Sequence, residues 1–342
     1  LSNPEDIKIG FESTAHYALN LELFLENAHH SFMEVNPVLI KEYKKSTTLR
    51  RTKTDSVDCE SIARWLITVE YKPHSKGFYH AYSLKSLTRL RDRLIRQRSF
   101  YLVKITNVLD HTFPEFKPFF NERLSKTALY LLENYGSAEK MARMNSASYD
   151  KLRCISRGKF SIQQFLRLKE LAANTVGVNN SIFDLELNTL LTLYKSLSDE
   201  INTLETEIIK LIEEVHPHYM SIPGIGPISA AVIYAEYGDI SNFSNPGQML
   251  AFAGIEPGIN DSGTESHGGR MVKHGSSQLR YVLLNACLPL IRFDLTFATY
   301  YEKKRAEGKK HRVAITHVAK KLIRVIYALE RQDVDFNAQK LR

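Results

Sequence analysis

Two carboxylates stand close together near residue 55. Asp55 and Asp58 lie three positions apart, directly after a basic run that ends at Lys53. At the start of a helix, residues with this spacing project from one face, where they could hold a divalent cation through oxygen ligands. The same pair would also be favourable as plain negative charges at a helix N-terminus. On their own, the two aspartates leave both interpretations open.

A second chemical group lies in a polar, glycine-rich stretch between residues 252 and 270. Ser262 precedes Gly263 there, and a long loop between two helices is usually functional or mobile. We expect Ser262 to present a hydroxyl nucleophile at the tip of this loop, although most Ser-Gly pairs are simply turns. Four basic or titratable residues follow that could balance the charge of a phosphate: Arg270, Lys273, His274 and Arg280.

Two glycines precede this stretch. Gly224 and Gly226 stand ahead of a segment rich in small residues, which is the pattern of a helix-hairpin-helix turn. In such a turn the backbone approaches a phosphate, and the free N–H groups of the next helix receive the anion. A tight turn between packed helices is the competing interpretation.

The elements that must position these groups change along the chain. Over the first sixty residues, strand patterns (6–12 and 31–35) alternate with helical ones (17–28 and 38–44). This order predicts a small α/β unit with a parallel sheet. The segments that follow are mainly helical.

A long basic helix is predicted over residues 83–110. Arg89, Arg93 and Arg96 lie on it, and a helix of this charge could run along a phosphate backbone. A bundle helix with a solvated charged face is equally compatible with the pattern.

An uninterrupted apolar seam runs from Leu187 to Val215, with steps of three and four residues. This is an a/d heptad pattern, and it predicts a long helix that Pro217 terminates. We favour an intermolecular coiled coil or a long antiparallel hairpin over a plain buried helix.

Composition narrows the classes of function. The chain has 342 residues and a formal net charge of +8, from 46 Lys and Arg against 38 Asp and Glu, which favours a polyanionic partner. Its three cysteines are far apart, which fits a reducing cytoplasm rather than a disulfide framework or a zinc ribbon. No apolar run approaches the roughly 20 residues of a membrane span, so we expect no membrane association.

Three segments together resemble the DEDD transposases of bacterial insertion sequences, the Piv-invertase relatives that are guided by a bridge RNA. Residues 10–17 are similar to the glutamate-bearing motif of that family. The stretch KTDSVDCESIA, residues 53–63, is similar to its paired-aspartate motif, with Cys59 in place of an alanine. Residues 222–280 are similar to its C-terminal transposase domain. The segments come in the family's order and cover most of the chain.

The resemblance implies three domains. Residues 1–80 would form a partial RuvC-like (RNase H-like) α/β domain, and residues 81–216 a helical and coiled-coil connector. Residues 217–342 would form a helical C-terminal serine transposase domain with a helix-hairpin-helix-like turn. The fold class is therefore α/β plus all-α. The implied partners are DNA, a structured guide RNA, and further copies of the chain in a dimer or tetramer joined through the coiled coil.

The resemblance also implies roles for individual residues. Glu12, Asp55 and Asp58 would hold Mg²⁺ as the second, third and fourth of four acidic ligands, and Ser262, with Ser266 as the runner-up, would attack DNA. The family's first aspartate lies on a strand that would precede the first printed residue. We therefore expect an N-terminally truncated chain with impaired metal binding and little strand-transfer activity.

The sequence thus predicts a DNA transposase or recombinase of an insertion sequence, in which Mg²⁺ assists a serine. Two other functions compete with it. One is a catalytically impaired nucleic-acid-binding remnant of such an enzyme. The other is a RuvC-like metal nuclease that hydrolyses DNA with water and leaves Ser262 structural.

Overall fold

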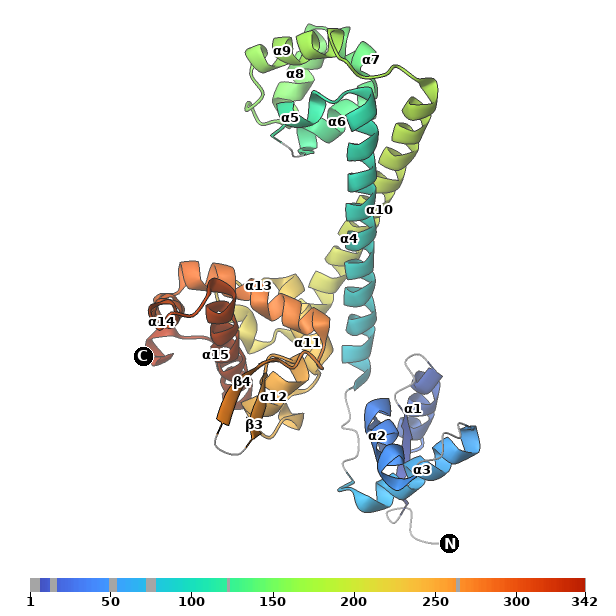
Figure 1. Ribbon diagram of the computed structural model, residues 1–342, viewed down its shortest axis with the longest axis vertical. Helices are drawn as coiled ribbons and strands as arrows, with labels where there is room; N and C mark the ends of the chain where they lie inside the picture. The colour runs from blue at the N-terminus through green and yellow to red at the C-terminus, as the bar shows by residue number, and fades with distance from the viewer. Residues whose placement is uncertain are drawn as a thin grey trace. The chain divides into compact units, whose positions relative to one another are not determined.

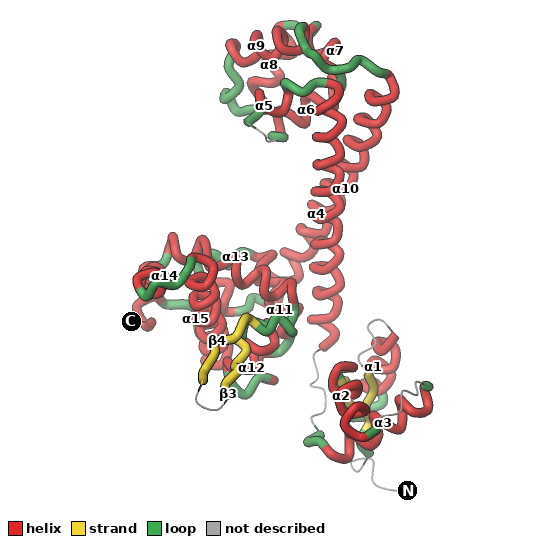
Figure 2. Tube along the Cα trace, viewed as in Figure 1, coloured by secondary structure: helices red, strands yellow, loops and turns green. Residues whose placement is uncertain are grey.

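The computed structural model describes residues 7–12, 17–48, 54–71, 78–121, 124–262 and 265–341. The chain divides into two compact units, residues 1–80 and 81–342, which are described separately below. Most of the described residues are helical, and the strands among them form two small two-stranded sheets (Figure 2). The predicted mixture is confirmed in its coarse form, a mostly helical chain with one small parallel sheet near its N-terminus.

The first unit follows the predicted β-α-β-α order (Figure 1). Strand β1 (Ile9–Glu12) pairs in parallel with β2 (Phe32–Val35), and α1 (Ala18–Asn27) connects them. Helix α2 (Pro37–Thr47) follows β2, and its first turn is capped by the Asn36 side chain, which accepts a hydrogen bond from Val38 N at 2.9 Å.

Helix α3 (Asp55–Thr68) packs against β1 and α2 in the same unit. Its buried Leu66 lies beside the strand, and the chain that leaves the helix reaches Tyr71. The Tyr71 hydroxyl accepts from Ile9 N at 3.2 Å and lies 3.0 Å from the carbonyl oxygens of both Ile9 and Ser31. One phenol therefore ties α3 to the beginnings of both strands.

The second unit contains two helical cores joined by two long helices. Helix α4 (Phe78–Thr112) and helix α10 (Ser181–Val215) each run for 35 residues. One core forms where the C-terminal end of α4 meets the N-terminal end of α10. Five short helices complete it: α5 (Phe116–Phe119), α6 (Lys126–Tyr135), α7 (Ala138–Ala142), α8 (Ser146–Ile155) and α9 (Ile162–Ala173). The other core forms around the opposite ends of α4 and α10 and the C-terminal helices.

The predicted heptad seam packs within the chain. Leu187 of α10 belongs to the same core as Ile105 of α4, and Ile208 of α10 to the same core as Leu84 of α4, so the two helices run antiparallel. Between these ends, Arg91 Nε donates to Glu205 Oε1 at 2.8 Å. The seam therefore forms the long antiparallel hairpin that was one of the two favoured interpretations, and an intermolecular coiled coil stays a prediction.

Besides the ends of α4 and α10, five helices contribute to the C-terminal core. They are α11 (Pro227–Tyr237), α12 (Pro246–Ala253), α13 (Ser277–Phe293), α14 (Leu295–Ala306) and α15 (His311–Gln332). Helix α15 contributes one continuous buried face, and α13 packs against α11, α14 and α15. Short 3-10 turns lie at His218–Ser221, Ile240–Asn242 and Ala338–Leu341.

The glycine-rich stretch is not the long loop that we expected. It forms an antiparallel hairpin of β3 (Pro257–Ser262) and β4 (Glu265–Met271), with a register irregularity between Pro257 and Ile259 (Figure 1). The inward-facing backbone groups of this stretch are paired across the hairpin, so a segment rich in polar and glycine residues can extend from the helical core as strands.

No single helix of the described residues is long and apolar enough to cross a membrane; only α13 and α14 together, bent by 107° between them, meet the criteria of length and composition.

One buried carboxylate joins three of these elements. Glu236 of α11 has a side chain that is 1% exposed. Arg89 of α4 donates to its two oxygens, from Nε at 2.9 Å and from Nη2 at 3.1 Å, and the hydroxyl of Ser276 ahead of α13 also bonds to it. Burial raises the pKa of Glu236, but the Arg89 hydrogen bonds and the Lys85 charge outweigh it, so the pKa lies below its usual value.

Removal of the Arg89 cation tests this junction. We expect Arg89→Met to lower the free energy of unfolding by about 2–4 kcal/mol, because it strands a buried carboxylate, and Glu236→Leu in the same chain to restore part of the loss. The exposed Arg93 is a matched control, and Arg93→Met should change stability by less than about 0.5 kcal/mol. Urea unfolding provides the measurement.

The same pair predicts a pH dependence. A carboxyl with a lowered pKa contributes stability above its unfolded pKa, and this contribution is lost as pH falls through the folded pKa. The difference between wild type and Arg89→Met should therefore shrink in acid. Equal stability of the two chains at neutral pH would contradict the assignment.

Candidate functional site

Ser262 is the last residue of β3, immediately before the two residues that connect the strands of the hairpin. Its backbone pairs with Glu265 of β4. Ser266, the runner-up, lies one step along β4 and pairs with Asp261. The two serines therefore occupy different strands near the same end of the hairpin. The predicted partner Arg270 also lies on β4, near its other end.

The base of the hairpin is fixed to the helical core. Val272 N donates to Glu256 O at 2.9 Å, which closes the two strands, and Ser276 N donates to Phe252 O at 3.1 Å. Gly275 makes a close approach possible, since a Cβ there would lie 2.0 Å from Phe252 O. Backbone contacts on both sides thus hold the start and the end of the hairpin against α12 and α13.

Basic residues lie near this base. Lys273 is exposed and adopts a left-handed backbone conformation, with φ of 56°. Arg280 of α13 donates from Nη1 to Ala253 O at 3.1 Å, so it also binds the C-terminal end of α12. Lys320 of α15 is close enough to Glu256 and Arg324 for their charges to act on it. Burial, more than the Arg324 charge, lowers the pKa of Lys320.

The two glycines of the predicted helix-hairpin-helix turn have different surroundings. Gly224 has φ of 99°, and a Cβ there would lie 2.9 Å from Pro289 Cγ and 3.1 Å from Leu290 N on α13. Gly226 has φ of −78° and forms the N-cap of α11, with no atom within 4 Å of a Cβ. Gly224 is required for packing, whereas Gly226 has open space in which another molecule could approach the backbone.

The three arginines that were predicted to contact nucleic acid also differ. The guanidinium of Arg89 is bound to the buried Glu236. Arg93 is exposed on α4, one turn further along. Arg96 has a side chain that is 73% exposed and pairs with Asp92 of the same helix at 2.8 Å. A phosphate would have to displace Glu236 from Arg89, so Arg93 and Arg96 are the more accessible of the three.

Glu236 itself was missed by the sequence analysis. It is the one charged residue of α11, whose other residues are apolar or small apart from Tyr234 and Tyr237. A lone carboxylate in such a helix must find a cation or be protonated. That signal could have indicated a partner, although not that the partner would be Arg89, 147 residues away.

Comparison with known proteins complements this geometry. A transposase family profile for IS110-type DEDD transposases matches residues 1–114, and the profile of the transposase IS116/IS110/IS902 family matches residues 217–302. The chain belongs to the IS110/IS900 family of transposases. The family predicted from the sequence is thereby confirmed.

Three relatives illustrate how far the similarity extends. An insertion element IS110 protein of Streptomyces coelicolor is 27% identical over 245 residues, which are 69% of this chain and 60% of the relative. An IS900 protein of Mycobacterium paratuberculosis is 28% identical, over 82% of this chain and 71% of the relative. The transposase for IS1111A of Coxiella burnetii is 25% identical, over 75% and 59%. The chain thus spans about three fifths of the length of two of these relatives.

The DEDD domain of this family implies the use of a divalent metal ion. Glu12 ends β1 and is half-buried, Asp55 begins α3 and is exposed, and Asp58 lies in the first turn of α3. Within the described part of the chain, no three His, Cys, Asp or Glu side chains gather closely enough to hold a metal ion. The three predicted ligands are therefore not assembled into a metal site, and we derive no chemical step through an ion.

One of these carboxylates is paired with a lysine. Lys44 of α2 forms an ion pair with Asp58 Oδ1, an atom that accepts no hydrogen bond from the other described residues. The pair is half-buried and joins α2 to α3. A metal ion at Asp58 would have to displace the Lys44 ammonium.

The two glycines of the predicted turn can be tested by one substitution made at each position. We expect Gly224→Ser to lower the free energy of unfolding by about 1–3 kcal/mol, because the new Cβ meets α13 and the backbone is left-handed. Gly226→Ser should leave stability unchanged or slightly raised, because serine is a good N-cap. Thermal unfolding of both variants provides the comparison.

Nucleic-acid binding by the same two variants separates a structural role from a contact role. If the Gly226 backbone contacts a phosphate, Gly226→Ser weakens DNA binding in a chain of normal stability. A Gly224→Ser chain as stable as wild type would contradict the packing role given to Gly224.

Proposed function

We propose that this chain is a DNA transposase or recombinase of an insertion sequence and that the Ser262 hydroxyl attacks a DNA phosphodiester. The observation that carries the proposal is the hairpin that holds Ser262, which lies inside the matched transposase region and is attached to the helical core by backbone hydrogen bonds at its base. A strand end of this kind can extend a nucleophile toward a polymer that is too large to enter a pocket.

The charges near the hairpin support a polyanionic substrate. Lys273, Arg280 and Lys320 lie around its base together with Glu256. The strands themselves carry Asp261, Glu265 and Arg270. A phosphodiester at the base of the hairpin would therefore meet three cations and one carboxylate, and preorganised cations stabilise the additional negative charge of the transition state. Exposed arginines such as Arg93 and Arg96 could contact more distant phosphates of the same duplex.

The chemistry conserves the number of phosphodiester bonds. The Ser262 oxygen forms a bond to phosphorus as the bond from phosphorus to one deoxyribose oxygen breaks. The serine proton is lost to solvent, and the departing deoxyribose oxygen takes up a proton and becomes a hydroxyl. Because the energy of the broken bond is kept in the serine phosphodiester, a second strand hydroxyl can reverse the step and join a new strand.

Three finer assignments belong to the same proposal. Glu12, Asp55 and Asp58 would hold Mg²⁺ once Lys44 has been displaced, and a structured guide RNA would select the DNA site, both as the family resemblance implies. A dimer or tetramer would form through the α4–α10 hairpin. Exposed Phe100, Val103 and Leu193 on these helices supply apolar surface that is compatible with such contact.

A covalent adduct with DNA is the direct test. Incubation with the DNA ends of the element and its non-coding RNA should give a protein–DNA band that survives denaturing electrophoresis. Ser262→Ala should remove that band to below detection, because it removes the attacking oxygen. Ser266→Ala is the matched control on the opposite strand and should retain the band.

Other outcomes identify the competing functions. Metal-dependent nicking that survives Ser262→Ala would support hydrolysis by water at the acidic residues and overturn the serine mechanism. Salt-sensitive DNA binding without any adduct, unchanged by Asp55→Ala or Asp58→Ala, would support a binding protein that no longer cleaves.

A further inference from the structure

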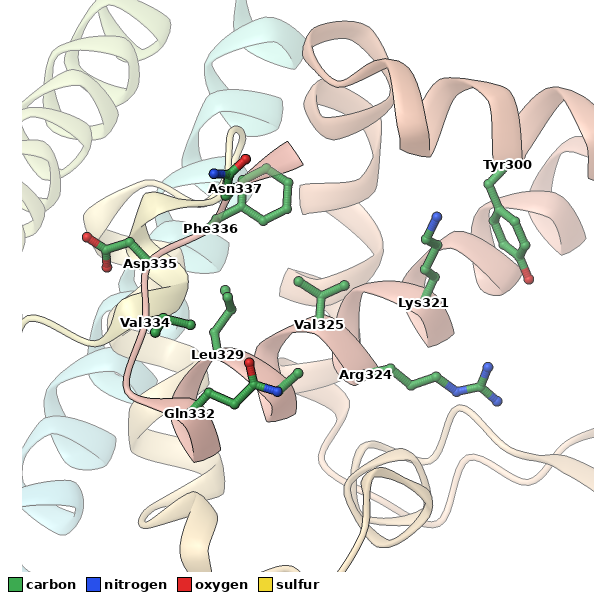
Figure 3. Close-up of a pocket in the computed structure, with 11 residues that line it drawn as sticks. Tyr300, Lys321, Arg324, Val325, Leu329, Gln332, Val334, Asp335, Phe336 and Asn337 are labelled. Atoms are coloured by element: carbon green, nitrogen blue, oxygen red, sulfur yellow. The ribbon is translucent and has the colours of Figure 1, made fainter. Parts of the chain in front are cut away.

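A cavity of about 520 Å³ lies in the C-terminal core, apart from the hairpin that carries Ser262 (Figure 3). Helix α15 forms its floor, Tyr300 of α14 lines one side, and the chain that follows α15 forms the other wall. Its volume falls within the range of small-molecule sites, about 300–1,000 Å³. The proposed chemistry on DNA makes no use of this cavity.

The two sides of the cavity differ in chemistry. Lys321, Arg324 and the Tyr300 phenol lie on one side, and Gln332, Phe336 and Asn337 on the other, while Val325 and Leu329 are apolar and lie between them (Figure 3). One side therefore offers two cations and a hydroxyl, and the other an aromatic ring beside the Asn337 amide, with the Gln332 amide further along the same wall.

Two aromatic rings hold the Lys321 ammonium on the cationic side of the cavity. The Lys321 ammonium lies 5.2 Å from the ring centroids of both Phe297 and Tyr300. Burial lowers the pKa of Lys321, and the charge of Asp294 acts in the opposite direction. An ammonium fixed over two rings is already oriented before an anion arrives.

The opposite wall is fastened to the turn that precedes Gly224. Phe336 N donates to Ser221 Oγ at 2.8 Å. His218 lies 2.9 Å from Asp335 through Nδ1 and 2.8 Å from Asp333 through Nε2. Asp335 is the one acid among the residues that line the cavity, and the imidazole beside it offsets its charge.

We propose that this cavity binds one unstacked nucleotide of a single-stranded nucleic acid, with the base against Phe336 and the phosphate at Lys321 and Arg324. A base presents a flat apolar face together with a polar edge, which matches an aromatic ring next to the Asn337 amide. A phosphate requires cations at the other end of the same ligand. This inference rests on the proposed function and deepens it, because strand exchange exposes unpaired nucleotides that the protein must hold.

Photo-cross-linking of the full chain tests the site. The probes are short DNA and RNA single strands that each carry one 5-iodouracil base, and a duplex of the same sequence is the comparison. We expect mass spectrometry to locate the cross-link at Phe336 or Tyr300 for a single strand and not for the duplex. The DNA and RNA probes show which polymer supplies the nucleotide. A cross-link outside the cavity, or an equal yield with duplex, would overturn the proposal.

Conservative variants make the test quantitative. Phe336→Leu keeps an apolar side chain and should weaken single-strand binding at least about fivefold, because stacking on the ring is lost. Lys321→Met should weaken it further at low salt and reduce its salt dependence. Phe293→Leu and Lys159→Met are matched controls at exposed positions outside the cavity. Normal binding by Phe336→Leu and Lys321→Met together would exclude the site.

Repeating the cross-link in a Ser262→Ala chain separates this proposal from the proposed function. The cavity does not need the nucleophile, so the cross-link should persist where the covalent adduct is lost. A chain that forms the adduct but gives no cross-link at the cavity would overturn the cavity alone. A chain that gives the cross-link but never the adduct would overturn only the serine mechanism.

The contact of His218 predicts how binding responds to pH. Hydrogen bonds to Asp335 and Asp333, together with the charge of Glu330, raise the pKa of His218 above its usual value. The stabilising contact between protonated His218 and the two aspartates is therefore fully present below the ordinary imidazole pKa. It is lost as pH rises through the raised pKa of His218. Single-strand binding should weaken from about pH 6 to about pH 8 more in wild type than in His218→Gln. The same slope in both chains would overturn the role given to His218.

Discussion

The buried carboxylate of Glu236 is the constraint on which the C-terminal part of the molecule depends. A charge with 1% side-chain exposure is tolerated only where it is fully paired, so Arg89 of the long basic helix and Ser276 ahead of α13 must both reach it. This single group thereby positions α4, α11 and α13 relative to one another. The glycine turn begins α11 and the hairpin ends just before α13, so both candidate segments are positioned by the same contact.

Local patterns in the sequence were sufficient to predict several of the elements. Alternation of strand and helix predicted the parallel pair β1–β2, and the three-and-four spacing from Leu187 to Val215 predicted α10 except for its first six residues. The hairpin was missed because glycine and polar residues between 257 and 271 weaken the alternation that marks a strand. The two-residue connection, which begins with Gly263, was the signal that could have indicated a hairpin.

The partners of these elements could not be predicted in the same way. Sequence spacing does not reveal that Arg89 binds a carboxylate 147 residues away rather than a phosphate, or that Lys44 pairs with Asp58. Nor does it distinguish Gly224, which packs against α13, from Gly226, which has open space. These contacts depend on tertiary packing. The sequence could therefore indicate which residues belong to the candidate site, but not which residues they contact in the folded chain.

We propose that the hairpin extends the reacting group while the helical core holds the polymer. Peptide mapping of the wild-type chain tests this arrangement. After reaction with its DNA and RNA, protease digestion and mass spectrometry should find one nucleotide-bearing peptide, with the modification on Ser262. A modification on any residue outside β3 and β4, in a chain that still recombines DNA, would contradict the account.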